Sequence, residues 1–148
     1  MARPSDLVVI TTLALGLGTA AAIDLRTRRV PNPLTAALAS AGIGLAATGL
    51  SGVSIGASLV GLVLGLTLML PGHLFGATGA GDVKLFAATG ALIGPVPIAV
   101  AFVYTAIAGG ALALIVALVR RRRGQLDDHY FAYAPAILVG TFIATLGR

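Results

Sequence analysis

The chain has 148 residues, of which 57% are hydrophobic and only 10% are charged, and its mean hydropathy is +1.00. A soluble domain of this length needs more charge to cover its surface, so the composition excludes that class and predicts one integral membrane domain over residues 1–148. The net charge of +5 does not indicate nucleic acid, because basic residues beside apolar runs usually set membrane topology and no aromatic residues alternate with them. The sequence has no Cys and two isolated His, so we expect no disulfide, metal or cofactor.

The first apolar run, residues 7–23, ends in small residues and resembles a signal peptide. The flank before it holds Arg3, offset by Asp6, whereas Arg26, Arg28 and Arg29 follow it. This order of charges predicts a retained helix whose N-terminus lies outside.

Two further apolar runs follow a break at Val30-Pro31-Asn32-Pro33. Residues 34–50 form one, and residues 53–70, which Pro71-Gly72 should end, form the other. Each approaches the ~20 residues that a spanning helix needs. Small residues in the third run predict close helix packing, at Gly56, Gly61 and Gly65.

After a glycine-rich loop, the apolar run of residues 85–119 is too long for one span, and the prolines of residues 94–97 divide it. This predicts a short fourth helix and a fifth over residues 98–119. A basic block (Arg120 to Arg123) and a polar turn precede a sixth segment, residues 130–146. We therefore expect an all-α, polytopic transmembrane helical bundle of about six spans.

The charges agree with six spans. Basic residues fall in loops that would face the cytoplasm, while the outside would hold only Arg3 and Arg148. The positive-inside rule then predicts a multi-pass protein of the inner (cytoplasmic) membrane with both termini outside. The block from Arg120 to Arg123 is expected to bind anionic lipids.

The acidic residues are five Asp, and there is no Glu. In this topology Asp24 and Asp82 both lie at the cytoplasmic face, at the end of the first span and the start of the fourth. Two carboxylates held close together in a poorly solvated place cannot easily both ionise, so one keeps its proton. Such a pair can activate water while it polarises a carbonyl, which predicts peptide hydrolysis.

Gly79 and Gly81 flank Ala80 just before Asp82. We expect them to form an unwound stretch beside which an extended peptide can lie. Simpler interpretations also exist: Asp82 as a helix N-cap or a partner of Lys84, and Asp24 as a partner of the basic loop. His73 is expected to pack in the loop, and Asp127 and Asp128 to form a solvated turn.

Both aspartate segments resemble motifs of one family. The segment Gly79-Ala80-Gly81-Asp82, followed by Lys84, resembles the GxGDxK signature of the type IV prepilin peptidases, which are integral-membrane aspartic proteases. The run from Asp24 to Asn32 resembles their other motif, an Asp followed by a basic loop and Ile-Pro-Asn, with Val30 in place of the Ile. Tyr133-Ala134-Pro135 is similar to the start of the family's last helix.

The resemblance implies an endopeptidase that cleaves the leader from a prepilin, a leader joined to an apolar helix, at the cytoplasmic face. It assigns catalysis to Asp24 and Asp82 only. We expect support of the loop or substrate from Gly79, Gly81, Lys84, Pro31 and Asn32. Larger members carry an N-terminal domain with paired Cys and N-methyltransferase activity. This sequence has no such region, so it resembles the short form of Flp/Tad pilus systems, and methylation is not expected.

A function of another class stays open: a small membrane transporter or scaffold, with Asp24 and Asp82 on a proton or cation path. Transport requires a carboxylate near the middle of the membrane, whereas proteolysis requires both at one face. The sequence favours proteolysis, and it does not identify the prepilin or the oligomeric state.

Overall fold

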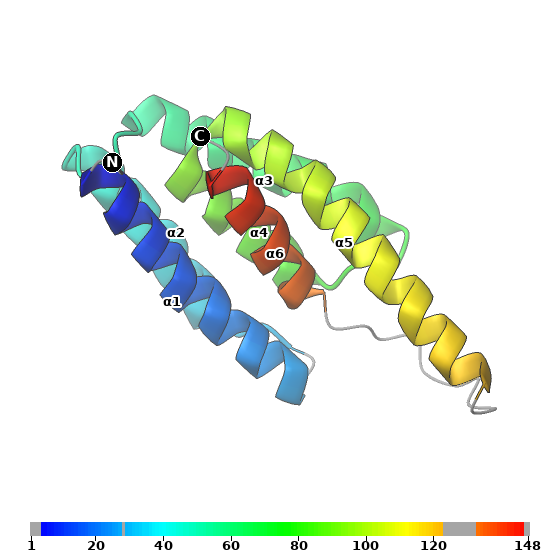
Figure 1. The fold of residues 1–148 in the computed structure, drawn as a ribbon. Helices are drawn as coiled ribbons and strands as arrows, with labels where there is room; N and C mark the ends of the chain where they lie inside the picture. The colour runs from blue at the N-terminus through cyan, green and yellow to red at the C-terminus, as the bar shows by residue number, and fades with distance from the viewer. Residues whose placement is uncertain (1–3, 28, 123–132, 147–148) are drawn as a thin grey trace.

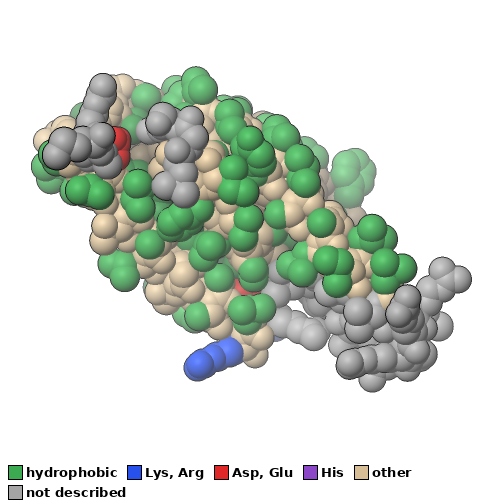
Figure 2. All heavy atoms as spheres, viewed as in Figure 1, with side chains coloured by type: hydrophobic (Ala, Val, Ile, Leu, Met, Phe, Trp, Pro, Cys, Tyr) green, Lys and Arg blue, Asp and Glu red, His purple; other side chains and the backbone are tan. Residues whose placement is uncertain are grey.

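The computed structural model describes residues 4–27, 29–122 and 133–146, and this part of the chain is an all-α bundle without strands (Figure 1). Its helices are α1 (Pro4–Thr27), α2 (Asn32–Ala47), α3 (Ile55–Leu74), α4 (Ala80–Ile93), α5 (Pro95–Arg122) and α6 (Ala134–Leu146). Three stretches are long and apolar enough to cross a membrane: Pro4–Thr27, Ile55–Leu74 and Pro95–Ile115. The predicted helical membrane bundle is confirmed, and hydrophobic side chains are spread over the face seen in Figure 2, where few charged side chains appear.

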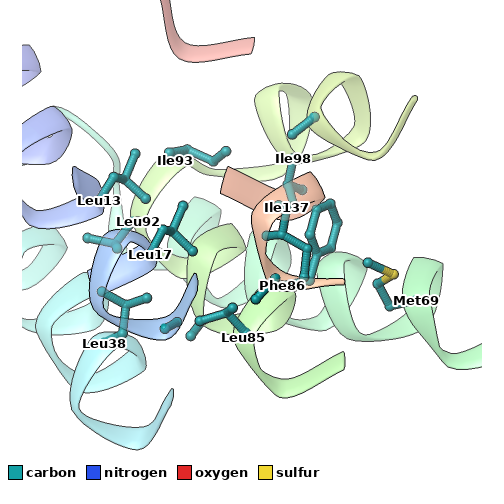
Figure 3. Close-up of a cluster of buried hydrophobic side chains, with 14 of the residues drawn as sticks. Leu13, Leu17, Leu38, Met69, Leu85, Phe86, Leu92, Ile93, Ile98 and Ile137 are labelled. Atoms are coloured by element: carbon teal, nitrogen blue, oxygen red, sulfur yellow. The ribbon is translucent and has the colours of Figure 1, made fainter. Parts of the chain in front are cut away.

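The short helix α4 forms the centre of the bundle. Of its 14 residues, 11 are buried, and it contacts every other helix, α3 and α2 most extensively. Phe86 and Leu92 of α4 pack with Leu17 of α1 and Ile137 of α6 in the core (Figure 3). Because α4 is largely enclosed by the other helices, it can be shorter than a membrane span.

Helices α3 and α4 approach closely where two glycines meet. A Cβ on Gly61 would collide with the backbone carbonyl of Gly90, and one on Gly65 would lie 2.8 Å from the Phe86 carbonyl oxygen. Ser58 Oγ donates a hydrogen bond of 2.7 Å to the Ala91 carbonyl across the same contact. Close packing is thus confirmed for Gly61 and Gly65, whereas a Cβ on Gly56 would meet nothing within 4 Å.

Several helix boundaries differ from the sequence prediction; helix α5, for example, begins at Pro95 and not at residue 98. Helix α3 continues through Pro71 to Leu74; the proline lies in the last turn, where it removes only one hydrogen bond, and its carbonyl accepts from the Phe75 N–H at 3.0 Å. Helix α4 begins at Ala80, so Gly81 is helical and not part of an unwound loop. Asp127, Asp128 and the first residues of the predicted sixth segment lie outside the described residues.

The chain order places the motif residues at one end of the bundle. Helix α1 begins and α6 ends at the upper end in Figure 1, whereas α1 ends, and α4 and α6 begin, at the lower end. Asp24, Asp82 and Ala134 belong to those three termini. The fold therefore brings together residues that are up to 110 positions apart.

Candidate active site

Asp24 lies in the last turns of α1 and is 4% exposed. Its Oδ2 accepts a hydrogen bond of 3.1 Å from the backbone N–H of Ala134, the first residue of α6. The first N–H groups of a helix have no partner within the helix, and they favour negative charge. The N-terminus of α6 therefore holds the Asp24 carboxylate in place.

Asp82 is the third residue of α4 and is 7% exposed. Its Oδ2 accepts a hydrogen bond of 3.1 Å from the Gly79 N–H. The N-cap residue is thus Gly79 and not Asp82, which contributes to the cap from the third helical position. Its Oδ1 is buried, and no donor in the described part of the chain reaches it. Capping therefore uses only one of the two carboxylate oxygens.

The two carboxylates are close enough to interact directly through their charges. Tyr133 lies just before α6, close enough for the charge of Asp82 to act on its phenol. Burial raises the pKa of its phenol above the ordinary value, and the negative charge of Asp82 raises it further. The site thus combines two buried acids, one unpartnered carboxylate oxygen and an aromatic ring.

Gly79 and Gly81, the two glycines just before Asp82, have different structural roles. Gly79 is the extended residue before α4, with φ −74° and ψ 152°. Gly81 lies in the helix, and a Cβ there would be 3.0 Å from Val30 Cβ and 3.2 Å from the Val30 carbonyl oxygen. The expectation of an unwound stretch is therefore wrong at Gly81. This glycine instead permits the close approach of Val30, which belongs to the motif that begins at Asp24.

A hydrogen bond of 3.0 Å from Lys84 Nζ to Asn32 Oδ1 also joins the two motifs. Residues two apart on a helix point to opposite sides, so Lys84 faces away from the side where Asp82 meets Asp24. Both partners line a cavity of about 440 Å³, together with Thr35, Ala36, Ala39, Leu62, Ala87 and Ala88. Pro31 precedes α2, and its carbonyl accepts from the Leu34 and Thr35 N–H groups at 3.1 and 3.3 Å.

Sequence reasoning missed the donor at Ala134 and the contact at Val30. The resemblance marks Tyr133-Ala134-Pro135 but gives it no role, and a backbone N–H carries no signal in composition or spacing. His73 lies in the last turn of α3 and is exposed, and its Nδ1 donates to the Thr78 carbonyl at 3.0 Å, which joins the end of α3 to the following loop.

Comparison with known proteins gives one match. The model of the type IV leader peptidase family matches residues 11–114, a stretch that includes both Asp24 and Asp82 and ends inside α5. Neither the curated proteins nor the solved structures give a match. Because the family model covers well over half of the chain, this helical membrane protein belongs to the type IV leader peptidase family, which is a family of proteases.

Proposed function

We propose that this chain is an aspartic endopeptidase that uses Asp24 and Asp82 to remove the leader of an Flp-like prepilin at the cytoplasmic face. One observation carries the proposal: the charge of buried Asp24 acts on buried Asp82 from a distant motif, and Oδ1 of Asp82 has no hydrogen-bond partner among the described residues. Burial disfavours two negative charges side by side, which favours a state in which the pair shares one proton.

The reaction needs only these two groups and water. The ionised carboxylate takes a proton from water, and the resulting hydroxide adds to the scissile carbonyl carbon while the protonated carboxyl donates to its oxygen. The tetrahedral intermediate then collapses, the C–N bond breaks and the amine leaves with a proton from the pair. One water is consumed, and a new carboxyl and a new amino group are formed.

The position of the acids favours proteolysis over transport. Asp24 and Asp82 belong to helix termini at one end of the bundle. In the proposed reaction, this is the end at which a substrate helix would leave the membrane. A peptide bond inside a membrane helix is protected, because its backbone groups are already hydrogen-bonded. Cleavage at this end would act on the segment where the leader meets the apolar helix and the chain becomes extended.

The remaining parts of the proposal concern the location of the protein in the membrane and the residues around the two aspartates. We assign the protein to the inner membrane, with both termini outside. The expected lipid anchor from Arg120 to Arg123 has no described side chains, so its support is the sequence alone. Of the residues predicted to support the site, Gly81 and the Asn32–Lys84 pair connect the two motifs.

A reconstituted cleavage assay tests the proposal. The purified protein in phosphatidylglycerol-containing vesicles is mixed with a leader peptide fused to an apolar helix, and mass spectrometry maps the cut. We expect one cut at the junction, lost in Asp24→Asn and Asp82→Asn. Proton or cation flux through the same vesicles that depends on both aspartates, without cleavage, would favour the transport function instead.

A further inference from the structure

The residue before α6 is placed by a contact with α5. Gly109 of α5 is buried, and a Cβ on it would lie 2.5 Å from Cε2 and 2.7 Å from Cζ and Oη of Tyr133. Only a residue without a side chain lets the ring lie this close. The neighbouring Gly110 faces open space, since a Cβ there would meet nothing within 4 Å.

The backbone transmits the position of this ring to the first turn of α6. The carbonyl of Tyr133 accepts from the N–H groups of Ala136 and Ile137, at 3.0 and 3.2 Å. Two turns further on, Gly140 packs against the backbone of Thr105 in α5. Helix α6 is thus fixed to α5 at two levels, and the Tyr133 contact is the one beside the acids.

The N–H that holds Asp24 comes from the very next residue, Ala134. We infer that Tyr133 is a positioning residue of the dyad: its ring docks on Gly109 and so fixes the start of α6, which places the Ala134 N–H on Asp24 Oδ2. This inference rests on the proposed function. The effect of the Asp82 charge on the Tyr133 phenol agrees with a ring that faces the site.

If Tyr133 positions the dyad, displacing its ring must change how the cleavage rate depends on pH. The titratable groups of the described residues that meet here are Asp24 from α1, Asp82 from α4 and Tyr133. An N–H donor stabilises the ionised form of a carboxylate. If the ring is displaced and the donor withdraws, a higher pH is needed to ionise the pair, so the acidic limb of the rate profile moves to higher pH.

The adjacent glycines of α5 supply a matched pair of variants. Gly109→Leu displaces the ring, whereas Gly110→Leu adds the same side chain at an open position. We expect Gly109→Leu to lower the cleavage rate about tenfold and to move the acidic limb up by about one pH unit, the shift that a tenfold change in ionisation requires. Gly110→Leu should keep the wild-type rate and profile.

Variants of Tyr133 separate the ring from its hydroxyl. Tyr133→Phe keeps the ring and should cleave within about twofold of wild type, whereas Tyr133→Ala should behave like Gly109→Leu. In the Tyr133→Ala background, Gly109→Leu should add nothing, because the contact is already absent. Equal profiles for Gly109→Leu and Gly110→Leu would overturn the inference, and so would a Tyr133→Phe variant as impaired as Tyr133→Ala.

A readout without catalysis keeps the inference separate from the proposed function. In an Asp82→Asn background, dicyclohexylcarbodiimide labels Asp24 only while that carboxyl is protonated, and mass spectrometry follows the label against pH. We expect labelling to persist to higher pH in Gly109→Leu than in Gly110→Leu. If wild type cleaves and the labelling curves coincide, positioning by Tyr133 fails while the peptidase stands. If wild type does not cleave but the curves differ, the positioning stands and the proposed function fails.

Discussion

The two oxygens of Asp82 have different surroundings, and this division has a chemical consequence. Oδ2 accepts the Gly79 N–H and orders the first turn of α4, while Oδ1 is buried without a donor from the described residues. A buried carboxylate oxygen without a hydrogen bond is costly, so this oxygen is a natural place for a polar partner from outside the chain. Under the proposed function, that partner is the attacking water or the scissile carbonyl.

The first prediction concerns the acids themselves. Asp24→Asn and Asp82→Asn should each lower leader cleavage by about 10²- to 10⁴-fold, the range for loss of a general acid or base. The double variant should be little worse, because the pair acts as a unit. An amide oxygen can still accept the Gly79 or Ala134 N–H, so the melting temperature in detergent should change little.

The matched control is Asp6→Asn, which alters an acid in the first turn of α1, at the other end of that helix. It should cleave at the wild-type rate. Substantial cleavage by Asp24→Asn or by Asp82→Asn would remove that residue from the mechanism.

The second prediction concerns Gly81. An added Cβ would lie 3.0 Å from Val30 Cβ, so Gly81→Ala forces the two motifs apart by a few tenths of an ångström and should lower cleavage several-fold. Gly81→Val adds more bulk and should lower cleavage about tenfold further, because overpacking forces backbone shifts. Gly44→Ala is the control, since a Cβ there would meet nothing within 4 Å. Wild-type cleavage by Gly81→Val would show that the approach of Val30 does not position Asp82.

At the scale of helices, the contact between α3 and α4 supports the whole site, because α4 carries Asp82. The third prediction is that Gly61→Ala destabilises the protein by about 1–3 kcal/mol, as overpacking does. Its Cβ would collide with the carbonyl of Gly90, a backbone group that cannot rotate away. Reversible unfolding in mixed detergent micelles measures the change.

Gly56→Ala is the control from the same helix. Its Cβ meets open space, and Ala is the better helix former by about 1 kcal/mol, so this variant should be as stable as wild type or more stable. Equal stability of both variants would show that the Gly61–Gly90 contact is not close in the membrane.

The sequence predicted the helices well because apolar length is a strong signal in membrane proteins. It placed the boundaries less well where glycine and proline have two possible effects. Pro71 can end a helix or lie in its last turn, and Gly81 can permit unusual torsion angles or a close contact. Only the tertiary neighbours, Phe75 for Pro71 and Val30 for Gly81, decide between these effects.

At the scale of the whole molecule, charge asymmetry was enough to place Asp24 and Asp82 at one end. The rule counts basic residues in loops, so it assigns ends of helices without any knowledge of packing. It could not predict that α6 supplies a donor to Asp24 or that Lys84 turns away toward Asn32. Those features depend on which helices are neighbours and how they are rotated, and the apolar faces of this sequence do not specify either.

The fourth prediction tests the orientation of the bundle in the membrane. The chain lacks Cys, so single cysteines can be introduced without removing native ones, at Thr48 after α2 and at Arg29 between α1 and α2. Both positions are exposed. A membrane-impermeant maleimide added to intact spheroplasts should label Thr48→Cys and spare Arg29→Cys, which should react only after the membrane is opened.

The same experiment bears on the chemistry, since Arg29 belongs to the motif that begins at Asp24. Labelling of Arg29→Cys from outside would place the dyad at the outer face, where a prepilin leader in the cytoplasm cannot reach it. Labelling of both variants in intact spheroplasts would contradict the positive-inside assignment for this loop. Protection of Arg29→Cys, together with cleavage of a leader presented from the cytoplasmic side of inverted vesicles, would put the acids and the scissile bond on the same face of the membrane.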